Sequence, residues 1–182
     1  MEVSTKASGS GRQLVVLAAI VAAAGIVQLP LLSTMSKHGA GLFEFELMRT
    51  PERAGRLLDG WGSSGVSAAR LSSGIDFLFI AAYAAFFSVA GSALRTRLGD
   101  RRNPLLARAA SLVGPVGVAA AIANAVAKTA LLGVVYGYPD GPAPGIAFVA
   151  SIATYVLLGS AVILAGLTRL AVLAQPQERP PA

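Results

Sequence analysis

Cysteine is missing from the sequence, and histidine occurs once, at His38. Without thiols the chain can form no disulfide, no thiolate metal site and no cysteine nucleophile. A single histidine also disfavours a haem site or a histidine-rich metal site, because both depend on imidazole ligands. We therefore expect no metal site and no cofactor.

Charged residues are scarce as well. They make up 13% of the chain, whereas soluble domains carry about 25%. The net charge of +6 would suit a nucleic-acid partner, but no basic patch interleaved with aromatic residues is present. A membrane protein needs Lys and Arg on its cytoplasmic side to set its orientation, and this explains the basicity more simply. The lipid bilayer is the expected partner, and nucleic acid is not.

Most of the sequence consists of long apolar runs, which lie at about residues 14–35, 71–94, 105–135 and 145–168. Each has about 20 residues or more, enough to cross a ~30 Å hydrocarbon core as a helix. Backbone groups in lipid must be hydrogen-bonded internally, so helices are expected. The sequence predicts an all-α fold, an integral membrane four-helix bundle in a single domain over residues 1–174, with a mobile tail at 175–182. Gly and Ala are frequent in three of the runs and favour close helix packing.

The first apolar run has a second interpretation, as a signal peptide. Lys6 and Arg12 precede it, and the small residues at 22–24 resemble a cleavage site. A cleaved signal would end there, whereas the apolar run continues through Leu32. A retained helix, bent near its outer end by Pro30, is the preferred interpretation, and cleavage stays open as the alternative.

The distribution of Lys and Arg predicts the orientation. The two tails and the loop between the second and third runs hold nine of them, the first loop holds five beside four acids, and the third loop holds none. Because Lys and Arg are enriched in cytoplasmic loops, both termini are expected in the cytoplasm of a bacterium, with the chain in its cytoplasmic membrane.

The first outer loop is the longest segment between two runs. Thr50 is a suitable N-cap residue and Pro51 a suitable first helical residue. A short amphipathic helix is therefore predicted at about residues 51–60 in this extracytoplasmic loop, followed by Trp61 at the membrane interface. It would either cover the bundle as a lid or serve as an ordinary packed connector.

Two charged residues interrupt the apolar runs at similar depth, Asp76 in the second and Lys128 in the third. A charge inside a span costs about 2.5–3.5 kcal/mol on the insertion scale, and an ion pair would reduce this cost. Helical spacing adds Asn124 to the face of Lys128 and Tyr83 to that of Asp76, and Tyr155 lies at a similar depth.

These positions predict a polar ligand site in the outer half of the bundle, with Glu44, Glu46 and His38 at its mouth. The ordinary alternative is that Lys128 snorkels outward, that Asp76 is hydrated, and that both tyrosines are core residues.

One segment resembles a known family. The residues that carry the resemblance are Phe43-Glu44-Phe45-Glu46-Leu47, Thr50-Pro51-Glu52-Arg53-Ala54, Leu57-Leu58, Trp61-Gly62, Asp76-Phe77-Leu78-Phe79 and Tyr83. Over about residues 43–83 the chain is similar to a family of small bacterial proteins with four transmembrane helices and no assigned activity. The resemblance implies the four-span fold and draws attention to Glu44, Glu46, Trp61 and Asp76.

Besides a transporter-like oligomer, which would have to be a dimer because one four-span chain is small for a transport path, two hypotheses about function remain. The first is a non-catalytic membrane protein that binds a lipophilic small molecule or supports a membrane protein partner. The second is a membrane-embedded enzyme acting on a lipid or isoprenoid, with Asp76 or Glu46 as the acid. The sequence lacks the HExxH, GxSxG and P-loop motifs, so the non-catalytic hypothesis is preferred. The candidate ligand-binding residues are Asp76, Lys128, Asn124, Tyr83, Tyr155, Glu44, Glu46 and Trp61.

Overall fold

The structure, a computed structural model, describes residues 3–37, 41–98, 104–138 and 140–174, with side chains from residue 11 onward. His38 and the predicted tail at 175–182 lie outside the described residues. Every regular element in the described part is a helix: α1 (Val3–Lys37), α2 (Leu42–Glu46), α3 (Pro51–Leu98), α4 (Pro104–Val135) and α5 (Ala143–Leu173). The all-helical prediction is confirmed.

Four of these helices, all except α2, are long and apolar enough to cross a membrane. They correspond to the four apolar runs. The predicted run at 105–135 nearly coincides with α4, whereas α1, α3 and α5 extend beyond their runs.

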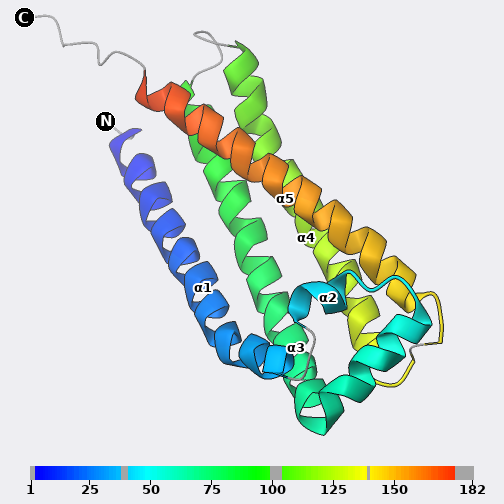
Figure 1. Ribbon diagram of the computed structural model, residues 1–182. Helices are drawn as coiled ribbons and strands as arrows, with labels where there is room; N and C mark the ends of the chain where they lie inside the picture. The colour runs from blue at the N-terminus through cyan, green and yellow to red at the C-terminus, as the bar shows by residue number, and fades with distance from the viewer. Residues whose placement is uncertain (1–2, 38–40, 99–103, 139, 175–182) are drawn as a thin grey trace, which may run out of the picture.

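The helices lie side by side with a simple order of packing (Figure 1). α3 packs against α1 on one side and α4 on the other, and α5 packs against α4 and to a smaller extent α3; among the described residues, α1 and α5 make little contact with each other. The N-terminal end of α1 and the C-terminal end of α5 lie together at the upper end of Figure 1. α2, the first turns of α3 and the start of α5 lie at the opposite end, called the far end below.

Residues 51–60 are helical and form the first part of α3, which a kink at Gly62 joins to the second apolar run. Thr50 Oγ1 accepts a hydrogen bond of 3.4 Å from the Arg53 backbone N–H, and hydrogen bonding with the Thr50 side chain lowers the pKa of Glu52. Gly62 then has φ 58° and ψ −166°, a conformation essentially restricted to glycine. The chain turns sharply there and continues as the long apolar part of α3.

Trp61, expected at the membrane interface, is instead in the protein core. It is 1% exposed, and its ring lies 4.9 Å from that of Phe45 in α2. The turn at Gly62 folds the first part of α3 back over the far end, so the indole faces protein. Helical spacing within residues 51–61 could not predict this, because it depends on where α2 lies.

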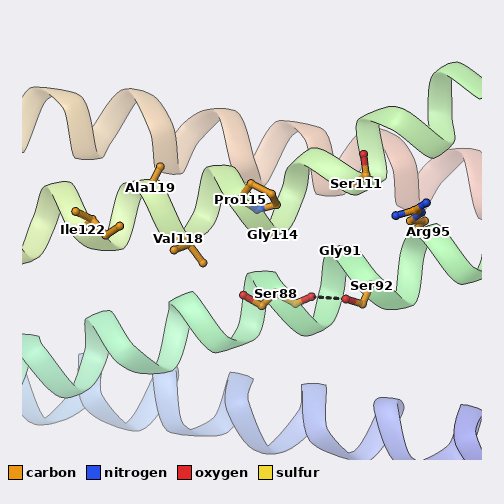
Figure 2. A pocket seen from close by; sticks show the side chains of 10 residues that line it. All are labelled: Ser88, Gly91, Ser92, Arg95, Ser111, Gly114, Pro115, Val118, Ala119 and Ile122. Carbon is orange, nitrogen blue, oxygen red and sulfur yellow. Dashed lines mark hydrogen bonds between the residues drawn. The ribbon is translucent and has the colours of Figure 1, made fainter.

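Glycine residues allow α3 and α4 to approach each other closely, because there is no room for a Cβ atom at the contact. A Cβ atom at Gly91 would lie 2.9 Å from the backbone nitrogen of Gly114, and one at Gly117 would lie 2.4 Å from Phe87 Cβ. Beside this contact lies a groove of about 570 Å³. Figure 2 shows its wall, formed mostly by small or apolar side chains of both helices, with Arg95 at one end.

Candidate functional site

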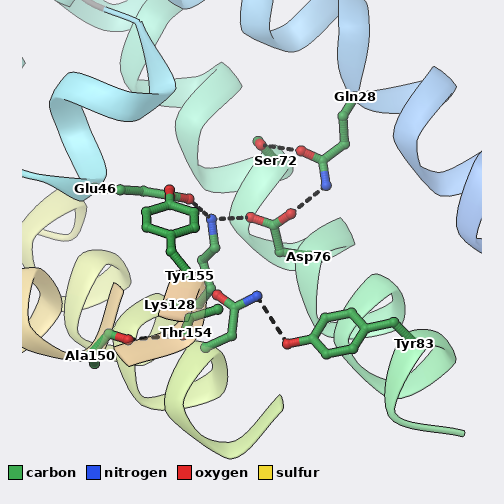
Figure 3. A network of polar contacts seen from close by, with 10 residues as sticks. Gln28, Glu46, Ser72, Asp76, Tyr83, Lys128, Ala150, Thr154 and Tyr155 are labelled. Atoms are coloured by element: carbon green, nitrogen blue, oxygen red, sulfur yellow. Dashed lines mark hydrogen bonds and ion pairs between the residues drawn. The ribbon is translucent and has the colours of Figure 1, made fainter. Parts of the chain in front are cut away.

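The centre of the candidate site is the side chain of Lys128 on α4. Lys128 is buried, and its ammonium group forms ion pairs with two carboxylates, Glu46 of α2 and Asp76 of α3. The Nζ atom of Lys128 lies 2.5 Å from Oδ2 of Asp76. The expected pair of Asp76 and Lys128 is present, and the alternative that Lys128 extends outward is wrong. One short helix and two long helices meet at this cation (Figure 3).

Glu46 reaches Lys128 because α2 turns inward at the far end. Within this five-residue helix Phe45 and Glu46 are buried. Glu44 lies on the exposed side, where its Oε2 accepts a 2.6 Å hydrogen bond from the backbone N–H of Gly41 and caps α2. The two glutamates that sequence analysis placed together at the mouth therefore have different roles.

Asp76 is held from the other side by α1. The side-chain amide of Gln28 donates a hydrogen bond to Asp76 Oδ1. Ser72 Oγ donates to Gln28 Oε1 over 3.0 Å and so orients the amide. Sequence analysis missed Gln28 and Ser72. Gln28 had a detectable signal, since it is the one polar side chain between Gln13 and Ser33.

The predicted tyrosines and asparagine lie around the same cluster. The hydroxyl of Tyr155 on α5 donates a hydrogen bond to Glu46 Oε2. Asn124 Nδ2 donates to Tyr83 Oη over 3.4 Å, a long contact. Tyr83 is buried among aromatic rings, 5.4 Å from the Phe79 ring centroid. Tyr155 therefore completes the charged cluster, and Asn124 pairs with Tyr83 beside it.

A cavity of about 250 Å³ lies against this cluster. All five helices contribute to its wall, which includes Gln28, Glu46, Asp76, Asn124, Lys128 and Tyr155 together with Gly25, Leu32, Leu42, Phe43, Phe79, Ser151, Thr154 and Leu158.

The cavity has an open side. Phe43 and Tyr155 both line it, their ring centroids are 6.2 Å apart, and they remain 67% and 38% exposed. The opening therefore lies beside these two rings, where α2 meets α5. Glu44, Trp61 and Tyr83 do not line the cavity.

Other charged groups at the far end interact elsewhere. The guanidinium of Arg49 lies over the Phe148 ring at 4.8 Å, and that of Arg70 lies over the Tyr136 ring at 4.6 Å. The charges that line the cavity are those of Glu46, Asp76 and Lys128. No group of three or more His, Asp or Glu side chains within residues 11–37, 41–98, 104–138 and 140–174 could hold a metal ion.

Comparison of the sequence with protein-family models, with curated proteins and with solved structures found no match. What the chain does must therefore be inferred from the cavity. A wall that combines buried charges with apolar side chains and an open side has the composition of a small-molecule site. It can hold a polar group against the cluster while an apolar group extends through the opening.

Proposed function

We propose that the chain is a multi-pass protein of the bacterial cytoplasmic membrane, with α1, α3, α4 and α5 as its spans. The apolar length of these helices supports this. Arg12, Arg95, Arg97, Arg108 and Arg169 lie toward the end where α1 begins and α5 ends, which supports cytoplasmic termini. The far end then faces outward. Retention of α1 belongs to the proposal, because Gln28 supplies a donor to Asp76.

Within that membrane setting, we propose that the protein binds a lipophilic molecule with a polar head in the cavity beside Lys128. The observation that carries this proposal is that buried charges line a cavity with an open side. Charged residues within a membrane are costly and usually mark a functional site.

The size of the cavity favours a head group over a whole lipid. Its volume of about 250 Å³ lies just under the ~300–1,000 Å³ range of ligand pockets, so a long chain would have to continue outside. α1 and α5 both contribute to the wall and make little contact with each other. An alkyl chain would leave between them toward the surrounding lipid.

Filling the cavity without changing its charge tests this function. Gly25 lines the cavity, and a Cβ atom there would meet no atom within 4 Å. We expect Gly25→Phe to place a ring in the cavity and to reduce co-purifying lipophilic ligand several-fold, as measured by mass spectrometry of extracts from purified protein. Gly159→Phe is the matched control, because Gly159 is exposed on α5, has similar free space and does not line the cavity.

The two variants must be compared at equal folded content, established by circular dichroism and size-exclusion chromatography. A normal ligand content in Gly25→Phe would contradict the proposed site. Equal loss in both variants would show that added bulk acts through the membrane surface and not through the cavity, and would also count against it.

A further inference from the structure

The charges that line the cavity do not balance. Glu46 and Asp76 each contribute one negative charge when ionised, and Lys128 contributes one positive charge. Their sum is one net negative charge. The cationic side chains of Arg49 and Arg70 interact with aromatic rings elsewhere and do not line the cavity. An unbalanced charge away from water is unfavourable, so the cluster favours one additional positive charge.

A proton on either carboxyl would also remove the imbalance, but the groups that face the four carboxyl oxygens are placed to donate hydrogen bonds. The oxygens of Glu46 face the Lys128 ammonium and the Tyr155 hydroxyl. Oδ1 of Asp76 accepts from Gln28, and Oδ2 faces Lys128. The ammonium and the amide N–H groups can only donate, whereas the Tyr155 hydroxyl can donate or accept.

Asp76 also keeps unused capacity as an acceptor. It is 6% exposed, its Oδ2 atom lies 2.5 Å from the Lys128 ammonium, and a carboxylate oxygen can accept more than one hydrogen bond. Asp76 lines the cavity. A donor carried by a bound molecule could therefore reach a buried, ionised oxygen atom.

We propose that the ligand is an amphiphilic cation, an alkyl chain with an ammonium head, whose positive charge balances the cluster of Glu46, Asp76 and Lys128. This inference rests on the proposed function and specifies the ligand class. An anionic head would raise the net negative charge of the site, and both carboxylates already occupy the Lys128 ammonium. A neutral head would leave the net charge unbalanced.

The remaining wall suits the same class of ligand. Phe43, Phe79 and Tyr155 line the cavity, and the faces of aromatic rings attract ammonium groups. Leu32 and Leu158 add apolar surface from α1 and α5, the two helices between which an alkyl chain would leave. The cation would thus lie beside the carboxylates, with aromatic rings at its sides and its chain in lipid.

The test compares three probes with one dodecyl chain and different heads: dodecylammonium, dodecanol and dodecyl phosphate. Binding to the unmodified, full-length protein in a neutral detergent is measured by native mass spectrometry as a titration. We expect the cation to bind at least about tenfold more tightly than either other probe, because it alone gains a charge-assisted contact with the carboxylates.

A pair of variants tests whether the preference for the cationic probe depends on the net charge of the cluster. Glu46→Gln removes the excess charge and is expected to reduce the preference for the cation to within about threefold, because a neutral cluster no longer favours a positive head. Glu44→Gln removes the same charge two residues away, on the exposed side of α2 and outside the cavity wall, and should keep the preference.

The outcomes separate this inference from the proposed function. Tighter binding of dodecanol or dodecyl phosphate, blocked by Gly25→Phe, would overturn the cationic ligand while supporting a lipophilic ligand site. Binding that Gly25→Phe does not affect, or no binding of any probe, would overturn both. The probe series needs no charged variant, so the test stands even if Glu46→Gln fails to fold.

Discussion

The single ammonium group of Lys128 faces two buried carboxylates. Substitutions at the three charged residues should therefore differ in their effect on stability. Removing Lys128 leaves Glu46 and Asp76 facing each other without a cation. Removing Glu46 leaves the Asp76–Lys128 pair, which is neutral and keeps its 2.5 Å contact. The residue that carries the single positive charge should therefore matter most for stability.

We predict that Lys128→Met lowers stability by about 3–5 kcal/mol, the usual cost of leaving a buried charge without its partner. Glu46→Gln should cost clearly less, because the amide can still accept a hydrogen bond from Tyr155. Thermal unfolding in detergent, followed by circular dichroism, measures both. Equal losses in the two variants would show that Lys128 does not hold the carboxylates together.

Among the elements, α3 and α4 lie backbone to backbone at Gly91 and Gly114. A methyl group at Gly91 would lie 2.9 Å from a backbone nitrogen atom, and backbone cannot rotate away as a side chain can. Separation of the helices is the remaining way to relieve the contact. It would disturb the frame that places Asp76 and Lys128 opposite each other.

We predict that Gly91→Ala lowers stability by about 1–3 kcal/mol, the typical cost of overpacking. Gly133→Ala in α4 is the matched control, because its Cβ would meet nothing within 4 Å and alanine favours helix by up to about 1 kcal/mol over glycine. Both variants can be compared by their unfolding midpoints in the same detergent. A midpoint for Gly91→Ala at or above that of the unmodified protein would contradict tight packing at this position.

The elements also show what sequence reasoning could and could not predict. Apolar runs predict helices well, because hydropathy and length are properties of a continuous segment. Helical spacing predicts that Asn124 and Lys128 share one face, since this depends on a single helix. Which helices are neighbours is not encoded in spacing, so the contact of Gln28 with Asp76 was missed. The inward turn of Glu46, in contrast to Glu44, depends on the path of α2.

For the whole molecule, the distribution of charge gives a testable sidedness. The described basic residues of the end that holds the chain termini should face the cytoplasm, and the far end with the cavity should face outward. The sequence contains no cysteine, so single introduced cysteines report position without background.

We predict that a membrane-impermeant maleimide added to intact cells labels Tyr138→Cys, beyond the end of α4, and does not label Thr96→Cys near the end of α3. Both native residues are exposed, so burial in the protein does not explain a difference. Labelling of Thr96→Cys only after cells are broken open would confirm the orientation. The reverse pattern would place the far end in the cytoplasm.

The sparse contact between α1 and α5 affects how ligand occupancy of the cavity should be measured. An amphiphile that enters between these helices arrives from the membrane and need not return to water. Its mole fraction in the outer leaflet then determines occupancy, and its aqueous concentration matters only through partitioning. Two amphiphiles with the same head and different chain lengths would differ greatly in apparent aqueous Kd. When affinity is expressed as a mole fraction in the membrane, the two amphiphiles should have nearly the same value.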